Sequence, residues 1–170
     1  MMLIALGVVV FGLMLFEARR SRRNELALLA RGGIEPRDDV YELMRIAYPA
    51  AFLAMIAESL VRGAPSRDVV IAGVALFGAA KALKYWAIAT LGPFWSFRVI
   101  VVPGASLVAK GPYRYLRHPN YVGVIGELAG VALMTGARLI GPIATLLFGL
   151  ILLRRITVEE KALAANGRSH

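Results

Sequence analysis

Cysteine is absent from the 170 residues of this chain, and histidine occurs only at His118 and His170. Without cysteine the chain cannot form a disulfide, a cysteine-ligated zinc site, an iron–sulfur cluster or a thiol nucleophile. A haem held by two axial histidines of one chain is also disfavoured, because one of the two histidines is the last residue. The sequence therefore points away from most metal and redox chemistry.

Acidic residues and long polar segments are scarce as well. Hydrophobic residues make up 58% of the chain and charged residues 18%, with a mean hydropathy of +0.65. This composition is too apolar for a soluble domain and excludes a water-soluble Rossmann-type enzyme. Lysine and arginine outnumber aspartate and glutamate by 20 to 11. Because these basic residues sit between apolar runs, and no nucleic-acid-binding motif is present, their excess predicts an anionic membrane surface as partner and no nucleic acid.

Five apolar runs divide the chain, each bounded by charges, glycine or proline. They are Met1–Phe16, Val40–Val61, Asp68–Leu91, Tyr121–Gly136 and Leu139–Ile156. Since about 20 apolar residues cross a bilayer as a helix, the pattern predicts an all-α membrane protein with about five transmembrane helices in one domain, residues 1–170. The first run is interpreted as a retained span and not a signal peptide, because no basic residue precedes it and no small-residue cleavage site lies before Arg19.

The basic residues between the runs predict how the spans are oriented, because loops rich in lysine and arginine stay in the cytoplasm. Fourteen of them fall on one side if the N-terminus is outside: Arg19, Arg20, Arg22, Arg23, Arg31, Arg37, Arg98, Lys110, Arg114, Arg117, Arg154, Arg155, Lys161 and Arg168. Only Arg62, Arg67 and Arg138 fall on the other side. We therefore expect the N-terminus outside and a C-terminal helix in the cytoplasm.

The longest connection, Gly92–Asn120, is also expected in the cytoplasm. Its residues Trp95, Phe97, Val99 and Val101 alternate with others, and Pro103-Gly104 marks a turn. This pattern is typical of a re-entrant or hairpin connection before the fourth helix. An irregular loop with aromatic residues at headgroup depth is the alternative.

Several charges fall inside the predicted spans, where they are costly. Glu42 and Arg45 lie one helical turn apart and can pair, while Lys81 and Lys84 share a face of the third span. Together with Glu127 in the fourth span they predict a polar cavity open to the cytoplasm, with Lys84 and Glu127 as candidate substrate contacts. Snorkelling and pairing between helices is the alternative interpretation.

Two motifs carry the chemistry. The first, Gly111–Gly123, reads GPYRYLRHPNYVG. Its Pro119 suits the first turn of a helix, whose free N–H groups and positive dipole end favour a carboxylate or phosphate. The alternative is a positively charged loop with interfacial tyrosines.

The second motif follows the fifth run. On a continuing helix Arg155 and Glu159 share one face, and Glu160 lies about 100° round the axis. By itself this motif could be an arginine anchor followed by a solvated surface. Glycines at 126 and 130 in the fourth span predict close packing against another helix.

Together the motifs resemble the isoprenylcysteine carboxyl methyltransferase family of integral-membrane enzymes that depend on S-adenosylmethionine. The matching residues are Gly111, Tyr113, Arg117, His118, Pro119, Tyr121, Gly123, Arg155, Glu159 and Glu160. The resemblance implies a catalytic core over residues 92–163 and a variable membrane part over residues 1–91. Asn24-Glu25 before Gly32-Gly33, Asn120, Glu127 and a short tail look closest to a bacterial branch associated with phenolic lipids and alkylpyrones, in the inner membrane.

The resemblance also implies the roles of the residues. Gly111, Tyr113, Arg117, His118, Pro119, Tyr121 and Glu160 would bind S-adenosylmethionine, which becomes S-adenosylhomocysteine, and no metal is required. Arg155 and Glu159 would lie near the transferred methyl group. Arg155 would orient an acceptor oxygen of a carboxylate, enol or phenol, and Glu159 would fix Arg155 or assist deprotonation. The acceptor would be a lipophilic or prenylated molecule that enters from the membrane.

Two other classes compete with this interpretation. Sterol-type membrane reductases that use NADPH carry a similar Arg-His-Pro-Asn-Tyr run, but they usually have glutamate three positions after the tyrosine, where this chain has Val124. A small transporter or scaffold would explain Lys81, Lys84 and Glu127 but not the Glu159-Glu160 pair.

Overall fold

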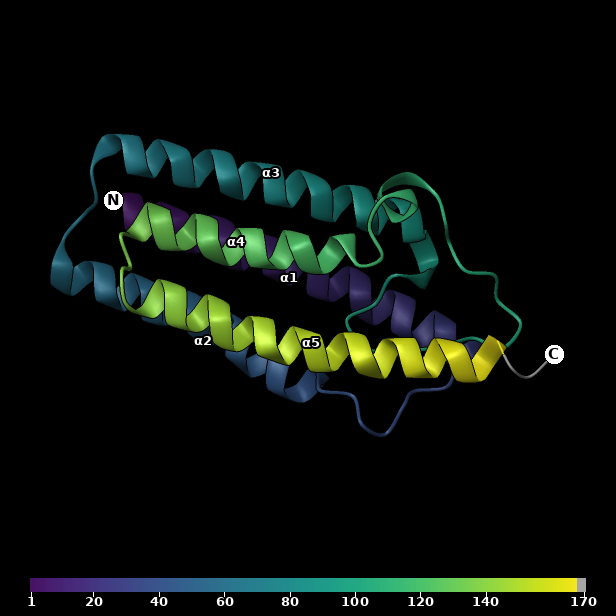
Figure 1. Ribbon diagram of the computed structural model, residues 1–170. Helices are drawn as coiled ribbons and strands as arrows, with labels where there is room; N and C mark the ends of the chain where they lie inside the picture. Colours follow the sequence, from purple (N-terminus) through teal and green to yellow (C-terminus); the bar gives the residue numbers. More distant parts are fainter. Residues whose placement is uncertain (168–170) are drawn as a thin grey trace.

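The computed structural model describes residues 1–167, which form a bundle of five α-helices (Figure 1). These are α1 (Met2–Ala30), α2 (Tyr41–Arg62), α3 (Arg67–Leu91), α4 (Pro119–Thr135) and α5 (Ile140–Gly167), with the short 3-10 helices η1 (Gly92–Phe94) and η2 (Gly111–Arg114) between α3 and α4. Arg168 and His170, which entered the sequence-based predictions, lie outside the described residues.

Successive helices run in opposite directions along the bundle (Figure 1). The N-terminus therefore lies at one end, and the end of α5 lies at the other. One end of the bundle is where α4 begins, and we call it the motif end. Helices α1 and α3 finish at this end, and α2 starts there. The odd number of helices explains this separation of the two termini.

The helices confirm the prediction of an all-α membrane protein. Four of them are long and apolar enough to cross a membrane, namely α1, α2, α3 with η1, and α5. Helix α4 has 17 residues, which is about the lower limit for a span and requires local thinning of the bilayer. The protein is therefore an integral membrane protein, and the predicted C-terminal helix is an unbroken continuation of α5 beyond Ile156.

The length of α1 corrects the predicted first span, Met1–Phe16. The helix has 29 residues and continues through the arginine cluster to Ala30, because arginine, leucine, alanine and glutamate favour helix and the first glycine after the cluster is Gly32. Only residues 31–40 remain as the connection to α2. The buried residues of α1 are Val10, Glu17, Ser21 and Leu28, which form one stripe at helical spacing.

Helices α3 and α4 pack with their backbones close together, as the glycines predicted. A Cβ atom at Gly130 would lie 2.8 Å from the backbone nitrogen of Phe77 and 3.0 Å from the carbonyl oxygen of Gly73. At Gly126 it would lie 2.8 Å from the Cβ of Ala80. Since backbone atoms cannot move aside as a side chain can, Gly130 is required for this approach.

Gly130→Ala is expected to destabilise the bundle by about 1–3 kcal/mol, because the added methyl group overpacks the contact between α3 and α4. Thermal unfolding of the detergent-solubilised protein measures the change. Gly78→Ala is the matched control, since a Cβ atom at Gly78 meets nothing within 4 Å. Equal unfolding temperatures for the two variants would contradict the close approach.

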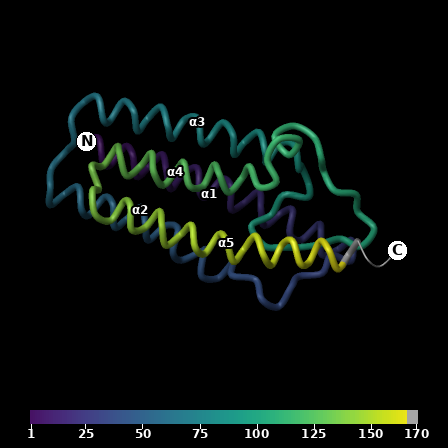
Figure 2. The backbone as a smooth tube through the Cα atoms, viewed as in Figure 1, coloured from purple at the N-terminus to yellow at the C-terminus, as the bar shows by residue number. Residues whose placement is uncertain are grey.

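The connection from α3 to α4 follows an irregular path around the motif end (Figure 2). Among the described residues it contains no strand, and Val101 forms an isolated antiparallel bridge with Ile34 of the α1–α2 connection. The side-chain amide of Asn24 donates hydrogen bonds to the carbonyl oxygens of Gly92 (3.1 Å) and Trp95 (2.7 Å). The backbone hydrogen bonds within this segment are those of turns, such as Ala105 to Val102, whereas its longer-range bonds go to α1 and residue 34. The irregular-loop alternative therefore fits it better than a hairpin.

Candidate functional site

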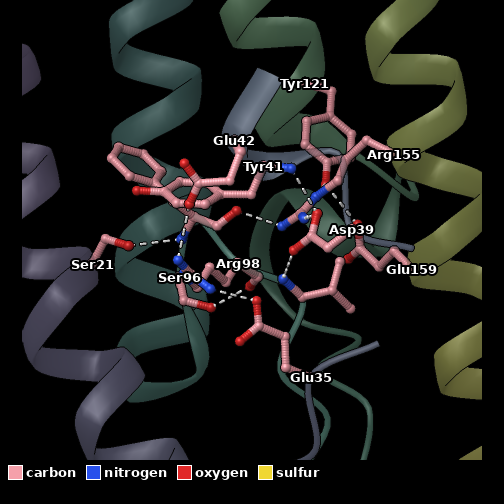
Figure 3. A network of polar contacts seen from close by, with 12 residues as sticks. Ser21, Glu35, Asp39, Tyr41, Glu42, Ser96, Arg98, Tyr121, Arg155 and Glu159 are labelled. Atoms are coloured by element: carbon pink, nitrogen blue, oxygen red, sulfur yellow. Dashed lines mark hydrogen bonds and ion pairs between the residues drawn. The ribbon is translucent and has the colours of Figure 1, made fainter. Parts of the chain in front are cut away.

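The two sequence motifs meet at the motif end, where the first turn of α4 lies beside the C-terminal half of α5. The connections 31–40 and 92–118 lie next to this junction and contribute polar groups to it (Figure 3). A chain of hydrogen bonds and ion pairs runs through the junction.

A tight turn sets the position of the α4 start. Gly111 has a φ of +54°, and a Cβ atom there would lie 2.5 Å from the hydroxyl oxygen of Thr90, so only glycine fits this position. Pro119 is buried in the first turn of α4, and the backbone of Tyr121 donates to the carbonyl oxygen of His118. As a result, the rings of His118 and Tyr121 stack with their centroids 5.5 Å apart.

The α5 carboxylates lie against these two rings. The Tyr121 hydroxyl donates a hydrogen bond of 2.7 Å to Glu159, and His118 Nε2 lies 3.3 Å from an oxygen of Glu160. His118 Nδ1 is 3.8 Å from Glu159. The structure thus brings together residues from both motifs, as the sequence interpretation expected.

Two further residues of the first motif lie at the edge of this contact. Arg117 is exposed and 3.8 Å from Glu160. Tyr113 is half-buried, and burial, aided by the negative charge of Glu159, raises the pKa of its phenol. Because its pKa is raised, Tyr113 keeps its proton at neutral pH and can donate a hydrogen bond.

Arg155 is buried beneath this layer. Its Nε donates to the Tyr121 hydroxyl at 3.3 Å, and its two terminal nitrogens donate to Asp39 and to the carbonyl oxygen of Phe97. The carboxylate that pairs with Arg155 is thus Asp39, and Glu159 reaches Arg155 only through the hydroxyl of Tyr121. Asp39 lies in the 31–40 connection, where sequence reasoning had not sought a site residue.

A second missed group ties the two connections together. Arg98 pairs with Glu35 at 2.7 Å and with Glu42 at 3.1 Å, and lies over the ring of Tyr41. The hydrogen bond that Arg98 donates to Glu35 raises the pKa of the guanidinium, so Arg98 stays charged at neutral pH. The predicted pair of Glu42 with Arg45 is confirmed at 2.8 Å. An isolated acid in a connection gives no sequence signal for such a distant partner.

Lys84 and Glu127 lie in a separate, buried cluster. Lys84 pairs with Glu17 at 2.7 Å and with Glu127 at 3.2 Å, and Lys81 pairs with the same carboxylates at 2.7 and 2.9 Å. The hydroxyl of Tyr48 donates to Glu127 at 2.6 Å. The helix-pairing alternative therefore holds for these charges: they neutralise one another and do not form the predicted open cavity.

A groove of about 530 Å³ lies beside the site, between the 31–40 connection and α5. It is lined by Pro36, Asp38, Val40, Arg154, Thr157, Val158, Lys161 and Ala162. Two of its charged residues, Asp38 and Arg154, are neighbours in sequence of Asp39 and Arg155, but they are not part of the hydrogen-bonded chain described above. In residues 1–167 no group of three or more histidine or acidic side chains could hold a metal ion.

Comparison with known proteins gives the family of the chain. The model of the isoprenylcysteine carboxyl methyltransferase (ICMT) family matches residues 72–165. The chain belongs to this family. The matched region runs from α3 to α5 and so includes both motifs, whereas α1, α2 and Asp39 lie outside it.

Two bacterial relatives cover most of the chain. The uncharacterized protein YpbQ of Bacillus subtilis is 32% identical over 143 residues, which are 84% of this chain and 85% of the relative. An uncharacterized protein of Haemophilus influenzae is 30% identical over 145 residues, or 85% of this chain and 84% of the relative. No solved structure matches the chain.

ICMT family members use S-adenosylmethionine as the methyl donor, and family membership indicates a membrane methyltransferase. The residues at the motif end fit such a cofactor. Glu160 is a partly exposed acceptor suited to its positively charged groups, and Tyr113 and His118 offer donors and ring faces. The side-chain oxygen of Asn120 is buried without a partner, which leaves one acceptor for a ligand donor.

Proposed function

We propose that the protein transfers a methyl group from S-adenosylmethionine to an oxygen of a lipophilic acceptor at the cytoplasmic face of a bacterial inner membrane. The contact between the start of α4 and the acidic pair of α5 carries this proposal: Tyr121 to Glu159 at 2.7 Å and His118 to Glu160 at 3.3 Å. Family membership supports the proposal as well, because the matched region includes both motifs.

The cofactor would be held by the residues of the first motif and by Glu160. These are Gly111, Tyr113, Arg117, His118, Pro119, Tyr121 and Glu160. When bound, S-adenosylmethionine supplies an activated methyl group on a sulfonium sulfur. The residues of the chain have to orient the acceptor in line with that group and exclude water, because the displacement needs little other help.

The acceptor oxygen would lie near Glu159. A phenol or enol acceptor gives its proton to the Glu159 carboxylate as the oxygen–carbon bond forms, and an acceptor that is already ionised needs no such base. The charge of Arg155 is already paired with Asp39, and its other two hydrogen bonds go to Phe97 and Tyr121, so it is poorly suited to neutralise a second carboxylate on an acceptor. The arrangement therefore supports a phenol or enol over a carboxylate, in agreement with the resemblance to the phenolic-lipid branch.

Titration of the purified protein with S-adenosylhomocysteine and, separately, with NADPH tests the proposal. We expect S-adenosylhomocysteine to bind in isothermal titration calorimetry and NADPH not to bind. Labelled methyl groups from S-adenosylmethionine should then appear in extracted membrane lipids. Binding of NADPH alone would favour a reductase, and binding of neither compound would contradict methyl transfer.

The orientation that we propose, with the motif end in the cytoplasm, is tested by single cysteines, because the natural chain has none. Ser106→Cys lies in the α3–α4 connection at the motif end, and Ser66→Cys precedes α3 at the opposite end. In spheroplasts a membrane-impermeant maleimide is expected to label Ser66→Cys at once and Ser106→Cys only after lysis. The reverse pattern would invert the topology.

A further inference from the structure

Asp39 is a buried acid that the family match does not cover. Its side chain is 5% exposed, and both of its oxygens are used. One accepts from Arg155 and from the backbone nitrogen of Tyr41 at 3.1 Å, and the other accepts from the backbone nitrogen of Val99 at 2.9 Å. These donors come from α5, α2 and the α3–α4 connection, so the carboxylate is fixed in one orientation.

Arg155, the partner of Asp39, is linked to Glu159 through a single hydroxyl group, that of Tyr121. Arg155 donates from Nε to the Tyr121 hydroxyl, which in turn donates to Glu159 (Figure 3). Asp39 and Glu159 therefore lie on opposite sides of the same guanidinium and phenol. A buried guanidinium needs a carboxylate partner, because an unpaired charge costs several kcal/mol in such a position.

We propose that Asp39 is a positioning residue for methyl transfer, which holds Arg155 away from Glu159 and so leaves that carboxylate free to accept the proton of the acceptor. The inference rests on the proposed function. Without the charge of Asp39, Arg155 turns towards Glu159, the remaining carboxylate of the network. A carboxylate in an ion pair is a weaker proton acceptor and is also displaced from its bond with Tyr121.

Asp39→Asn is the direct test, because it keeps the shape of the side chain and removes its charge. We expect kcat for methyl transfer to fall by roughly 10²-fold, the scale of a small displacement at a reacting group. The affinity for S-adenosylhomocysteine, measured by calorimetry, should change much less than kcat, because Asp39 reaches the residues assigned to the cofactor only through Arg155 and Tyr121. Asp39→Glu should recover part of the lost kcat.

Asp38→Asn is the matched control, since it makes the same chemical change one residue earlier, on the wall of the groove. It is expected to keep the kcat of the unaltered protein. Should Asp39→Asn not fold, the double variant Asp39→Asn/Arg155→Gln removes both buried charges and is expected to recover the unfolding temperature. If the double variant folds and Asp39→Asn does not, the result supports the pairing of Asp39 with Arg155.

Three results would overturn the inference. They are a normal kcat for Asp39→Asn, no gain of Asp39→Glu over Asp39→Asn, or a double variant as unstable as a poorly folded single variant. Failure of the proposed function looks different, because then the unaltered protein itself transfers no methyl group and does not bind S-adenosylhomocysteine.

Discussion

Glu159→Gln is expected to lower the rate of methyl transfer to a phenol or enol acceptor by 10²- to 10⁴-fold, the usual contribution of a general base. The amide keeps the size of the side chain and still accepts the hydrogen bond from Tyr121, so the fold should persist. Turnover with labelled S-adenosylmethionine and affinity for S-adenosylhomocysteine are the two measurements. We expect turnover to be almost lost and the affinity for S-adenosylhomocysteine to stay unchanged.

Glu160→Gln is the control, because it alters the neighbouring carboxylate, which contacts His118 and not Tyr121. It is expected to weaken the binding of S-adenosylhomocysteine more than it slows turnover at saturating cofactor. Near-normal turnover of Glu159→Gln would remove Glu159 from the chemistry. Arg155→Ala is also expected to abolish transfer, but it is a less specific variant, because it leaves the buried Asp39 without its cation.

The second large effect is expected from Lys84→Met in the buried cluster. Lys84 is 2% exposed and contacts both Glu17 and Glu127. Its removal leaves two carboxylates around the single ammonium of Lys81, so the cluster carries an unpaired negative charge. Breaking a buried pair from one side costs about 3–5 kcal/mol, which should greatly reduce the unfolding temperature in detergent.

A second substitution distinguishes charge from packing. In Lys84→Met/Glu127→Gln the pair of Lys81 with Glu17, 2.7 Å apart, remains and the cluster is neutral again, so much of the stability should return. Arg45→Met breaks the exposed pair with Glu42 and is expected to change stability little. If the double variant were less stable than Lys84→Met, the argument from charge balance would be wrong.

Hydropathy alone predicted most of the architecture. Five apolar runs correspond to the five helices, and the glycines at 126 and 130 predicted the close contact between α3 and α4. These features are local, because a helix satisfies its own backbone hydrogen bonds and must match the thickness of the bilayer. The first helix was predicted too short, since its last 14 residues contain four arginines and were interpreted as a connection.

The pairing of the buried charges could not be predicted in the same way. Lys81, Lys84 and Glu127 stood out as charges inside spans, but Glu17 lies 64 residues before Lys81 and at the edge of an apolar run. Likewise Asp39 lies 116 residues before Arg155. Such ion pairs depend on which helix faces which, and periodicity within one helix carries no information about its neighbour.

By itself the sequence determined that the chain is a helical membrane protein and predicted that residues 111–123 and 155–160 carry its chemistry, because hydropathy and motif are properties of contiguous residues. Only the tertiary structure decided that Tyr121 joins Arg155 to Glu159, and that Asp39 from the N-terminal part neutralises Arg155. The physical reason is that a buried charge takes its partner from whatever segment the fold brings within hydrogen-bonding distance.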